Sequence, residues 1–313
     1  MKRHHLNIAL LVVVAGLGVA VWFGQKKAEE KKPPLTTLDK SAVASIVIEH
    51  PGSPAIRLAK QNDVWMLTAP VQAETDPFET NALIGLADTG VQQTLAEGDL
   101  KELGLAPARY RITVNEHTID FGGEEPLKYR RYVLVDGKQI ALIDDPGSAA
   151  FDADYSDLVA KNLLPAHADI TRIAAPGLSI EKTAGGVWSS PDHPQARPEQ
   201  LLAVVEAWKN AKAMFNARIE PEDAKAQAVT VTLADGRTLG FNIVSREPQL
   251  LLSRADLGVR YTVSKADIDG LLKIAEPAAA NTAPATTPGV DTPAAASPSP
   301  QSTATPPAET QTP

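Results

Sequence analysis

The sequence has 313 residues, with 30 Lys and Arg against 38 Asp and Glu, a formal net charge of −8 and no Cys. This length permits two domains of ordinary size. The absence of Cys excludes disulfides, thiolate metal sites, a cysteine nucleophile and a lipid anchor on Cys. Because the acidic excess lies in the central residues 33–275 and acidic proteins repel polyphosphates, nucleic acid is not expected as a partner.

Residues 6–24 contain no charged side chain in 19 positions. At a helical rise of about 1.5 Å per residue they span roughly 28 Å, which predicts one transmembrane helix. The short basic tail at residues 1–5 favours a cytoplasmic N-terminus and a periplasmic body in the bacterial inner membrane. A cleaved signal peptide is the alternative, with a small-x-small site at residues 18–20. The apolar run continues beyond this site to Phe23, which favours an uncleaved anchor.

Composition divides the chain into five parts: a basic tail with its anchor (1–24), a charged linker (25–39), a first unit (40–165), a second unit (166–275) and a tail (276–313). Nine Pro fall among the last 37 residues, together with Ala, Thr and Ser. Such a segment buries too little apolar surface to offset the entropy of ordering, so the tail is predicted to be disordered. Two alternatives remain for the tail. It is a solvated segment with no specific partner, or it extends to contact the cell wall or a partner protein.

The two units repeat the same apolar patterns in the same order. Val64-Trp65 matches Val187-Trp188 at an offset of 123, and residues 118–121 match 238–241 at an offset of 120. Repetition at a nearly constant offset indicates internal duplication. We therefore predict an α+β fold of two tandem similar units, each built from short antiparallel strands with one or two helices.

Both units share one expected series of elements. Each begins with a strand pair split by a Gly/Pro turn, continues through a strand carrying a Trp, a helix and four further strands, and closes with a short helix. Asp76 with Pro77 marks the start of the first helix, and Pro198 marks the start of the second. The strands are expected at 45–49, 56–60, 111–114, 118–121, 130–135, 140–143, 170–174, 178–182, 229–233, 238–243, 249–253 and 259–263, and the closing helices near 152–163 and 265–274.

Trp65 and Trp188 occupy equivalent places in the two units, and each is followed by a Pro, at positions 70 and 191. A Trp on a short strand that turns at Pro can cover the core with its ring. We predict core packing for both. The alternative is a pair of aromatic platforms that bind a sugar or a peptide.

No group of residues in the sequence points to catalysis. The His residues show no metal-ligand spacing, and their only close carboxylate partners are in 167–169 and 192–193, which read as loops. The acidic pairs at 124–125 and 144–145 could serve glycoside chemistry, but adjacent acids at strand ends are typical of solvated turns. We therefore predict no enzyme activity and no catalytic, cofactor-binding or metal-ligating residue. The six His are His4, His5, His50, His117, His167 and His193.

Several short motifs resemble a known family. Trp65 is followed by Pro70, then by Leu-Gly-Leu-Ala-Pro at 103–107 and Arg-Arg-Tyr-Val-Leu-Val at 130–135. With the N-terminal span, this order resembles an uncharacterised bacterial envelope family, a domain of unknown function often found beside genes for gliding-motility-type ABC transporters. The second unit departs from it, with Ile-Glu-Pro at 219–221 in place of Leu-Gly-Leu. The resemblance implies an envelope protein auxiliary to an ABC-type export system, with no catalytic residues to carry over.

Together these features predict a membrane-anchored periplasmic accessory or scaffold protein. Its expected partners are the inner membrane, through one helix, and an envelope or membrane protein. Two alternatives remain open: a binding module for cell-wall glycan or peptide that uses Trp65 and Trp188, and a hydrolase whose site follows no familiar motif.

Overall fold

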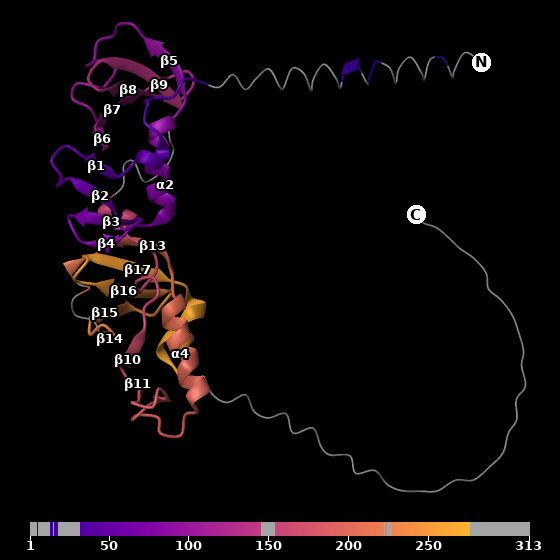
Figure 1. Ribbon diagram of the computed structural model, residues 1–313, viewed down its shortest axis with the longest axis vertical. Coiled ribbons are helices and arrows are strands. Elements are labelled where there is room, and N and C mark those ends of the chain that lie inside the picture. The colour runs from indigo at the N-terminus through magenta and orange to yellow at the C-terminus, as the bar shows by residue number, and fades with distance from the viewer. Residues whose placement is uncertain are drawn as a thin grey trace, which may run out of the picture. The chain divides into compact units, whose positions relative to one another are not determined.

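The computed structural model describes residues 32–144, 154–221, 223 and 227–275, together with His5, Val13, Val14, Gly16 and Leu17. The described residues from 32 to 275 belong to one compact unit. They form a mostly β protein with two antiparallel sheets and four α-helices (Figure 1). The antiparallel strands are therefore as predicted, but the helical share is smaller than an α+β fold implies.

The first sheet has nine strands in the order β4-β3-β2-β1-β6-β7-β8-β9-β5. Most neighbours in the sheet are also neighbours in sequence, so the sheet is largely a meander. Its strands are β1 (Ser45–Glu49), β2 (Ile56–Gln61), β3 (Val64–Ala69), β4 (Ala73–Glu74), β5 (Val91–Leu95), β6 (Tyr110–Val114), β7 (His117–Glu124), β8 (Arg130–Val135) and β9 (Gln139–Asp144).

The second sheet has eight strands in the order β12-β11-β10-β14-β15-β16-β17-β13. Each of them has a counterpart at the same place in the first sheet, where β4 adds one strand beyond β3. Trp65 and Trp188 therefore lie on corresponding strands, as do Phe121 and Phe241. The strands are β10 (Ile170–Ala175), β11 (Leu178–Lys182), β12 (Trp188–Ser189), β13 (Ala213–Arg218), β14 (Gln227–Leu233), β15 (Thr238–Ser245), β16 (Leu250–Arg254) and β17 (Val259–Val263).

Three strands were not expected from the sequence: the two-residue β4, and the edge strands β5 and β13. After the helix in each half, the chain crosses to the far edge of the sheet and pairs with β9 or β17. Only one side chain of β5 and two of β13 are buried, and each strand has a bulge near its start. Edge strands with a bulge lose the strict alternation that marks a strand in sequence.

The longer helices begin where the sequence predicts. The Asp76 carboxylate accepts hydrogen bonds from the backbone N–H groups of Phe78 and Glu79, at 2.8 and 3.3 Å, and so caps α2 (Pro77–Gly85). Helix α4 (Pro198–Asn210) opens on its Pro and buries one apolar face. Figure 1 shows α2 beside the first sheet and α4 beside the second. The buried face of α4 consists of Leu201, Val204, Val205 and Trp208.

The closing helices are shorter than predicted. Helix α3 covers only Tyr155–Leu158 rather than 152–163, of which residues 152–153 lie outside the described part of the chain. Residues 159–163 are not helical, and Val159 and Asn162 instead form isolated bridges with Thr75 and Lys212, beside the first and second sheets, as described below. In place of a helix over 265–274, a 3₁₀ turn (Lys265–Asp267) leads into α5 (Ile268–Leu272).

A second, smaller core lies under the Leu-Gly-Leu segment. Leu105 packs there with Leu134 and Ile140, apart from the main core. The segment approaches the backbone of β7 so closely that a Cβ at Gly122 would lie 2.5 Å from the carbonyl oxygen of Leu103. This motif therefore has a structural explanation, since only glycine at 122 leaves space for it.

The folded body begins inside the predicted linker. Pro34 forms a bridge with Gly90, and Leu35 and Thr36 are buried, so residues 33–36 belong to the first sheet and not to a spacer. The predicted span at 6–24 lies outside the described residues except for four of them, and the tail 276–313 lies wholly outside. Within the described part of the chain, no helix is both long enough and apolar enough to cross a membrane.

Candidate functional site

The segment that joins the two sheets is hydrogen-bonded to the edge of the first. We call residues 155–163 the connector. The Asp76 N–H donates to the Leu158 carbonyl oxygen at 2.8 Å, and the Ala160 N–H donates to the Glu74 carbonyl oxygen at 2.9 Å. The Lys161 ammonium lies 3.2 Å from the buried carboxylate of Asp76. The connector thus extends the first sheet beyond β4.

The same connector is hydrogen-bonded to the edge of the second sheet. The Leu163 N–H donates to the Ala211 carbonyl oxygen at 3.1 Å, and the Ala213 N–H donates to the Lys161 carbonyl oxygen at 2.8 Å. These bonds place the connector beside the start of β13. One stretch of nine residues therefore pairs with both sheets and satisfies edge groups that would otherwise be open to pairing with other chains.

Tyr155 fixes the start of the connector on the second sheet. Its hydroxyl donates to the carbonyl oxygens of Leu257 and Gly258, at 3.2 and 3.1 Å. The guanidinium of Arg218 lies 5.1 Å from the ring centroid and is also paired with Asp154. An aromatic ring held by two hydrogen bonds and a cation gives the connector a defined orientation.

The first sheet receives its incoming chain in the same way. The Leu35 N–H donates to the Thr89 carbonyl oxygen at 2.7 Å, and the Val91 N–H donates to the Pro33 carbonyl oxygen at 2.8 Å. Because β5 corresponds to β13, these bonds match those that the connector makes with the second sheet.

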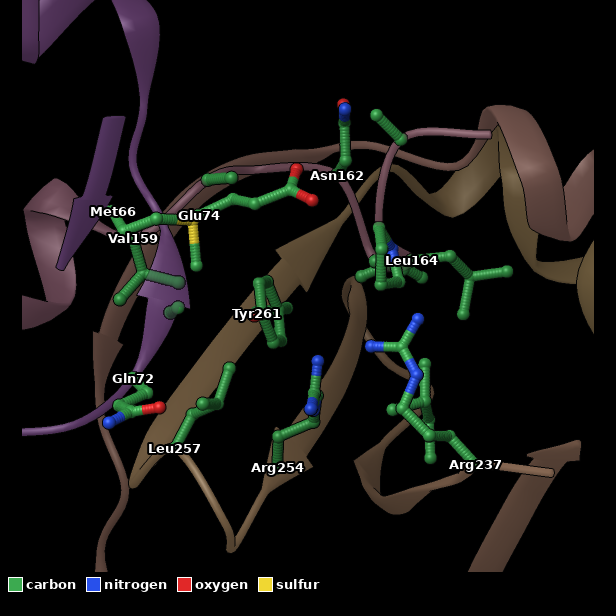
Figure 2. A pocket seen from close by; sticks show the side chains of 16 residues that line it. Met66, Gln72, Glu74, Val159, Asn162, Leu164, Arg237, Arg254, Leu257 and Tyr261 are labelled. Atoms are coloured by element: carbon green, nitrogen blue, oxygen red, sulfur yellow. The ribbon is translucent and has the colours of Figure 1, made fainter. Parts of the chain in front are cut away.

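A pocket of about 270 Å³ opens where the connector meets the two sheets. Figure 2 shows Glu74 and Asn162 on one side, Arg237 and Arg254 on the other, and Tyr261 between them. A carboxylate, an amide and two guanidinium groups around one hollow could hold a polar ligand with both acidic and basic groups.

The charges in the pocket are largely committed to neighbours. Arg254 is nearly buried, and its guanidinium makes two hydrogen bonds to the Asp256 carboxylate. The same guanidinium lies 5.6 Å from the ring centroid of Phe241. Arg237 is bonded to Asp235 at 2.7 Å. The cations in the pocket therefore stabilise hairpin turns of the second sheet.

Tyr261 makes the pocket sensitive to alkali. Burial raises the pKa of its phenol to about 12, from an ordinary value of 10. The folded state therefore favours the neutral phenol. The stability that the neutral phenol of Tyr261 contributes is fully present below pH 10. Between pH 10 and 12 the unfolded chain ionises first and stability falls, by about 3 kcal/mol for a shift of this size.

We accordingly expect a loss of stability between pH 10 and 12 that Tyr261→Phe largely removes. Urea unfolding of the full chain in detergent at pH 8, 10 and 11 measures it. The variant should match the wild type at pH 8 within about 1 kcal/mol. Burial also raises the pKa of Tyr155, which leaves a smaller residual loss. Equal alkaline losses in both proteins would contradict the assignment.

The two tryptophans singled out in the sequence are half-buried and pack against the main core. Trp65 lies opposite Lys60 in the pairing of β2 with β3, and Trp188 lies opposite Lys182 in the pairing of β11 with β12. The Lys182 ammonium is 6.0 Å from the centroid of the Trp188 ring. Each sheet thus carries a Lys–Trp pair at corresponding register positions.

Both sequence-adjacent His–carboxylate pairs lie in loops, as expected. Near residues 167–169, the Asp169 carboxylate is paired with the Lys182 ammonium at 3.8 Å. Near residues 192–193, the His193 Nε2 lies 3.1 Å from the carbonyl oxygen of Gly177. Among the residues that the structure describes, no group of three or more His, Asp or Glu could hold a metal ion.

A His–carboxylate contact that the sequence did not reveal joins His117 to Asp136, with Nδ1 and Oδ2 3.0 Å apart. The other carboxylate oxygen accepts a bond from the Thr118 N–H at 2.9 Å. Burial acts to raise the pKa of Asp136, but these hydrogen bonds outweigh it and lower the pKa. The pair joins the first residue of β7 to the turn after β8, and its separation of 19 residues gave no local signal.

Of the two acidic pairs, the one at 144–145 contributes an acid that is paired with cations. The Asp144 carboxylate lies 3.6 Å from Arg130 Nε and 3.9 Å from Lys32 Nζ, whereas Asp145 lies outside the described residues.

Compared with known proteins, the chain matches no protein-family model, no curated protein and no solved structure.

Proposed function

We propose that the chain is a single-pass protein of the bacterial inner membrane whose periplasmic body serves as a non-enzymatic accessory or scaffold. Residues 6–24 form the anchor, and the first residues stay in the cytoplasm. The partner is a membrane or envelope protein, such as a component of an ABC-type export system. The uncharged run of 19 residues behind a basic tail supports the anchor.

The observation that carries this proposal is the connector. It is hydrogen-bonded to both sheets and so links them, and a linked body on a short linker suits a scaffold. The matching strand orders and the matching bonds at β5 and β13 further support two tandem copies of one unit. Repetition of this kind supplies two similar surfaces in one chain.

Fractionation combined with a topology reporter tests the anchor. A reporter that is active only outside the cytoplasm, fused after Pro277, should be active. The fusion should stay in the membrane pellet after a carbonate wash. A soluble chain that begins near Val21 would show that the segment is a cleaved signal, and the proposed anchor would be wrong.

Binding of cell-wall glycan or peptide is a second candidate, and the repeated Lys–Trp pairs favour it. Half-exposed indole rings beside an ammonium group can stack on sugar rings and bind their acidic substituents. Sedimentation of the full chain with purified peptidoglycan tests this function. Support for this function requires that the wild type binds, that the double variant Trp65→Ala/Trp188→Ala does not, and that Leu202→Ala, on the surface of α4, binds like the wild type. Equal sedimentation of the wild type, the double variant and the control would count against this function.

A further inference from the structure

The loop between β7 and β8 presents two large apolar side chains to solvent. We call residues 125–129, with the sequence Glu-Pro-Leu-Lys-Tyr, the tip loop. Leu127 is 84% exposed and Tyr129 is 72% exposed. Leu127 is the most exposed large apolar side chain in the described part of the chain. Two large apolar side chains exposed on one short loop make this loop a candidate contact surface.

The tip loop has a fixed conformation. The Glu125 N–H donates to the Arg130 carbonyl oxygen at 2.6 Å, and the Tyr129 N–H donates to the Glu125 carbonyl oxygen at 3.1 Å. Tyr129 has a φ of +53°, in the left-handed region that costs a bulky residue about 1–3 kcal/mol. The loop thus tolerates backbone strain while it holds an aromatic ring outward.

The tip loop lies near the point where the chain enters the body. Asp144 interacts with both Arg130, which follows the loop, and Lys32, the first residue of the described body. Gly24, the last residue of the apolar segment, precedes Lys32 by eight positions, which span at most about 27 Å when fully extended. With residues 6–24 in a bilayer, the linker keeps Lys32 within this distance of the membrane surface.

The side chains around the tip loop suit a lipid headgroup region. Basic residues at 128, 130 and 131 balance the acids at 124, 125 and 144, and residues 26–32 add a net positive charge through Lys26, Lys27, Lys31 and Lys32 against Glu29 and Glu30. Leucine and tyrosine flanked by Lys and Arg are the residues that partition at membrane interfaces, with the ring at headgroup level and the cations near lipid phosphates.

The second sheet provides an internal comparison. Its corresponding loop, between β15 and β16, reads Arg-Glu-Pro-Gln at 246–249 and contains no large apolar residue. The two exposed apolar residues therefore occur only in the copy of the loop that lies near the anchor. A requirement of the fold itself would apply to both sheets.

We propose that the tip loop is a second membrane contact, in which Leu127 and Tyr129 enter the headgroup region of the bilayer that holds the anchor. This inference rests on the proposed function, because it requires residues 6–24 to be in the membrane. The occupant is a phospholipid surface with anionic headgroups. The contact fixes the orientation of the first sheet relative to the bilayer, which the linker alone does not.

The absence of Cys allows a clean test in the full chain. Leu127→Cys and, as the matched control, Arg246→Cys are each labelled with an environment-sensitive fluorophore. Both are then reconstituted into vesicles of phosphatidylcholine and phosphatidylglycerol at 3:1. With brominated lipids we expect at least a twofold loss of emission at position 127, and no loss at position 246. Equal emission at 127 with brominated and ordinary lipids would overturn the proposal.

A second variant separates loop insertion from mere tethering. A label at Lys128→Cys should be quenched in the otherwise native loop and lose this quenching when Leu127→Ser and Tyr129→Ser are added. Quenching that persists in the double variant would show that the tether alone holds the loop near lipid. A carbonate wash of the same vesicles distinguishes the two failures. A chain that washes off contradicts the anchor, whereas a retained chain without quenching contradicts only the loop contact.

Discussion

Replacing Trp208 by Ala is expected to lower the free energy of unfolding of the body by about 3–5 kcal/mol. Its side chain is fully buried in α4, and the ring centroid lies 5.3 Å from that of Phe241. The indole N–H donates to the Leu271 carbonyl oxygen at 2.9 Å and so holds α5 against α4. The substitution leaves a large cavity and an unpaired carbonyl group. Urea unfolding of the full chain in detergent, followed by circular dichroism, measures the loss.

Trp188→Ala is the matched control for this prediction. The Trp188 ring is half-buried at the edge of the second sheet, so its removal should cost about 1–2 kcal/mol. A loss at Trp208 no greater than the loss at Trp188 would contradict the core placement of Trp208.

Replacing Leu163 by Ala is expected to cost about 2–5 kcal/mol. Leu163 is fully buried in the main core, and it is the connector residue whose N–H donates to the Ala211 carbonyl oxygen. A cavity beneath the connector weakens its packing where it pairs with the second sheet. The same urea unfolding experiment measures the loss.

The control for Leu163 is Leu202→Ala on α4. Leu202 is 42% exposed, and a substitution at such a surface position should change stability by no more than about 0.5 kcal/mol. If both leucines cost the same, the connector is not part of the core, and the coupling of the two sheets loses its support.

Most of the strands were predictable from their apolar patterns. The expected bounds of β1, β8, β11 and β17 agree with the structure, and the other strands with expected bounds differ by one to three residues. In β1, β6, β11 and β15 the buried side chains recur at every second position, which is the signal of a half-buried strand. The edge strands β5 and β13 carry little of this signal, since most of their side chains are exposed and each has a bulge.

The connector and the pocket were not predictable. The sequence predicts a helix near 152–163, but only its start is helical, because α3 ends at Leu158. The residues that follow form bridges at Val159 and Asn162 with positions 75 and 212, and no local pattern encodes this pairing. The pocket likewise draws its side chains from both sheets. A signal was present in Pro165, which disfavours a helix that continues through Leu164.

The most direct measurement of the central claim, that the body is anchored outside the cytoplasm, uses single cysteines in this Cys-free chain. Lys138→Cys lies in an exposed turn of the first sheet, and His4→Cys precedes the apolar segment. In spheroplasts, a membrane-impermeant maleimide should label Lys138→Cys, and the labelled chain should stay in the membrane after a carbonate wash. His4→Cys should react only after lysis. Two results would contradict the account. One is labelling of His4→Cys in intact spheroplasts while Lys138→Cys stays protected. The other is release of the labelled body from the membrane by carbonate.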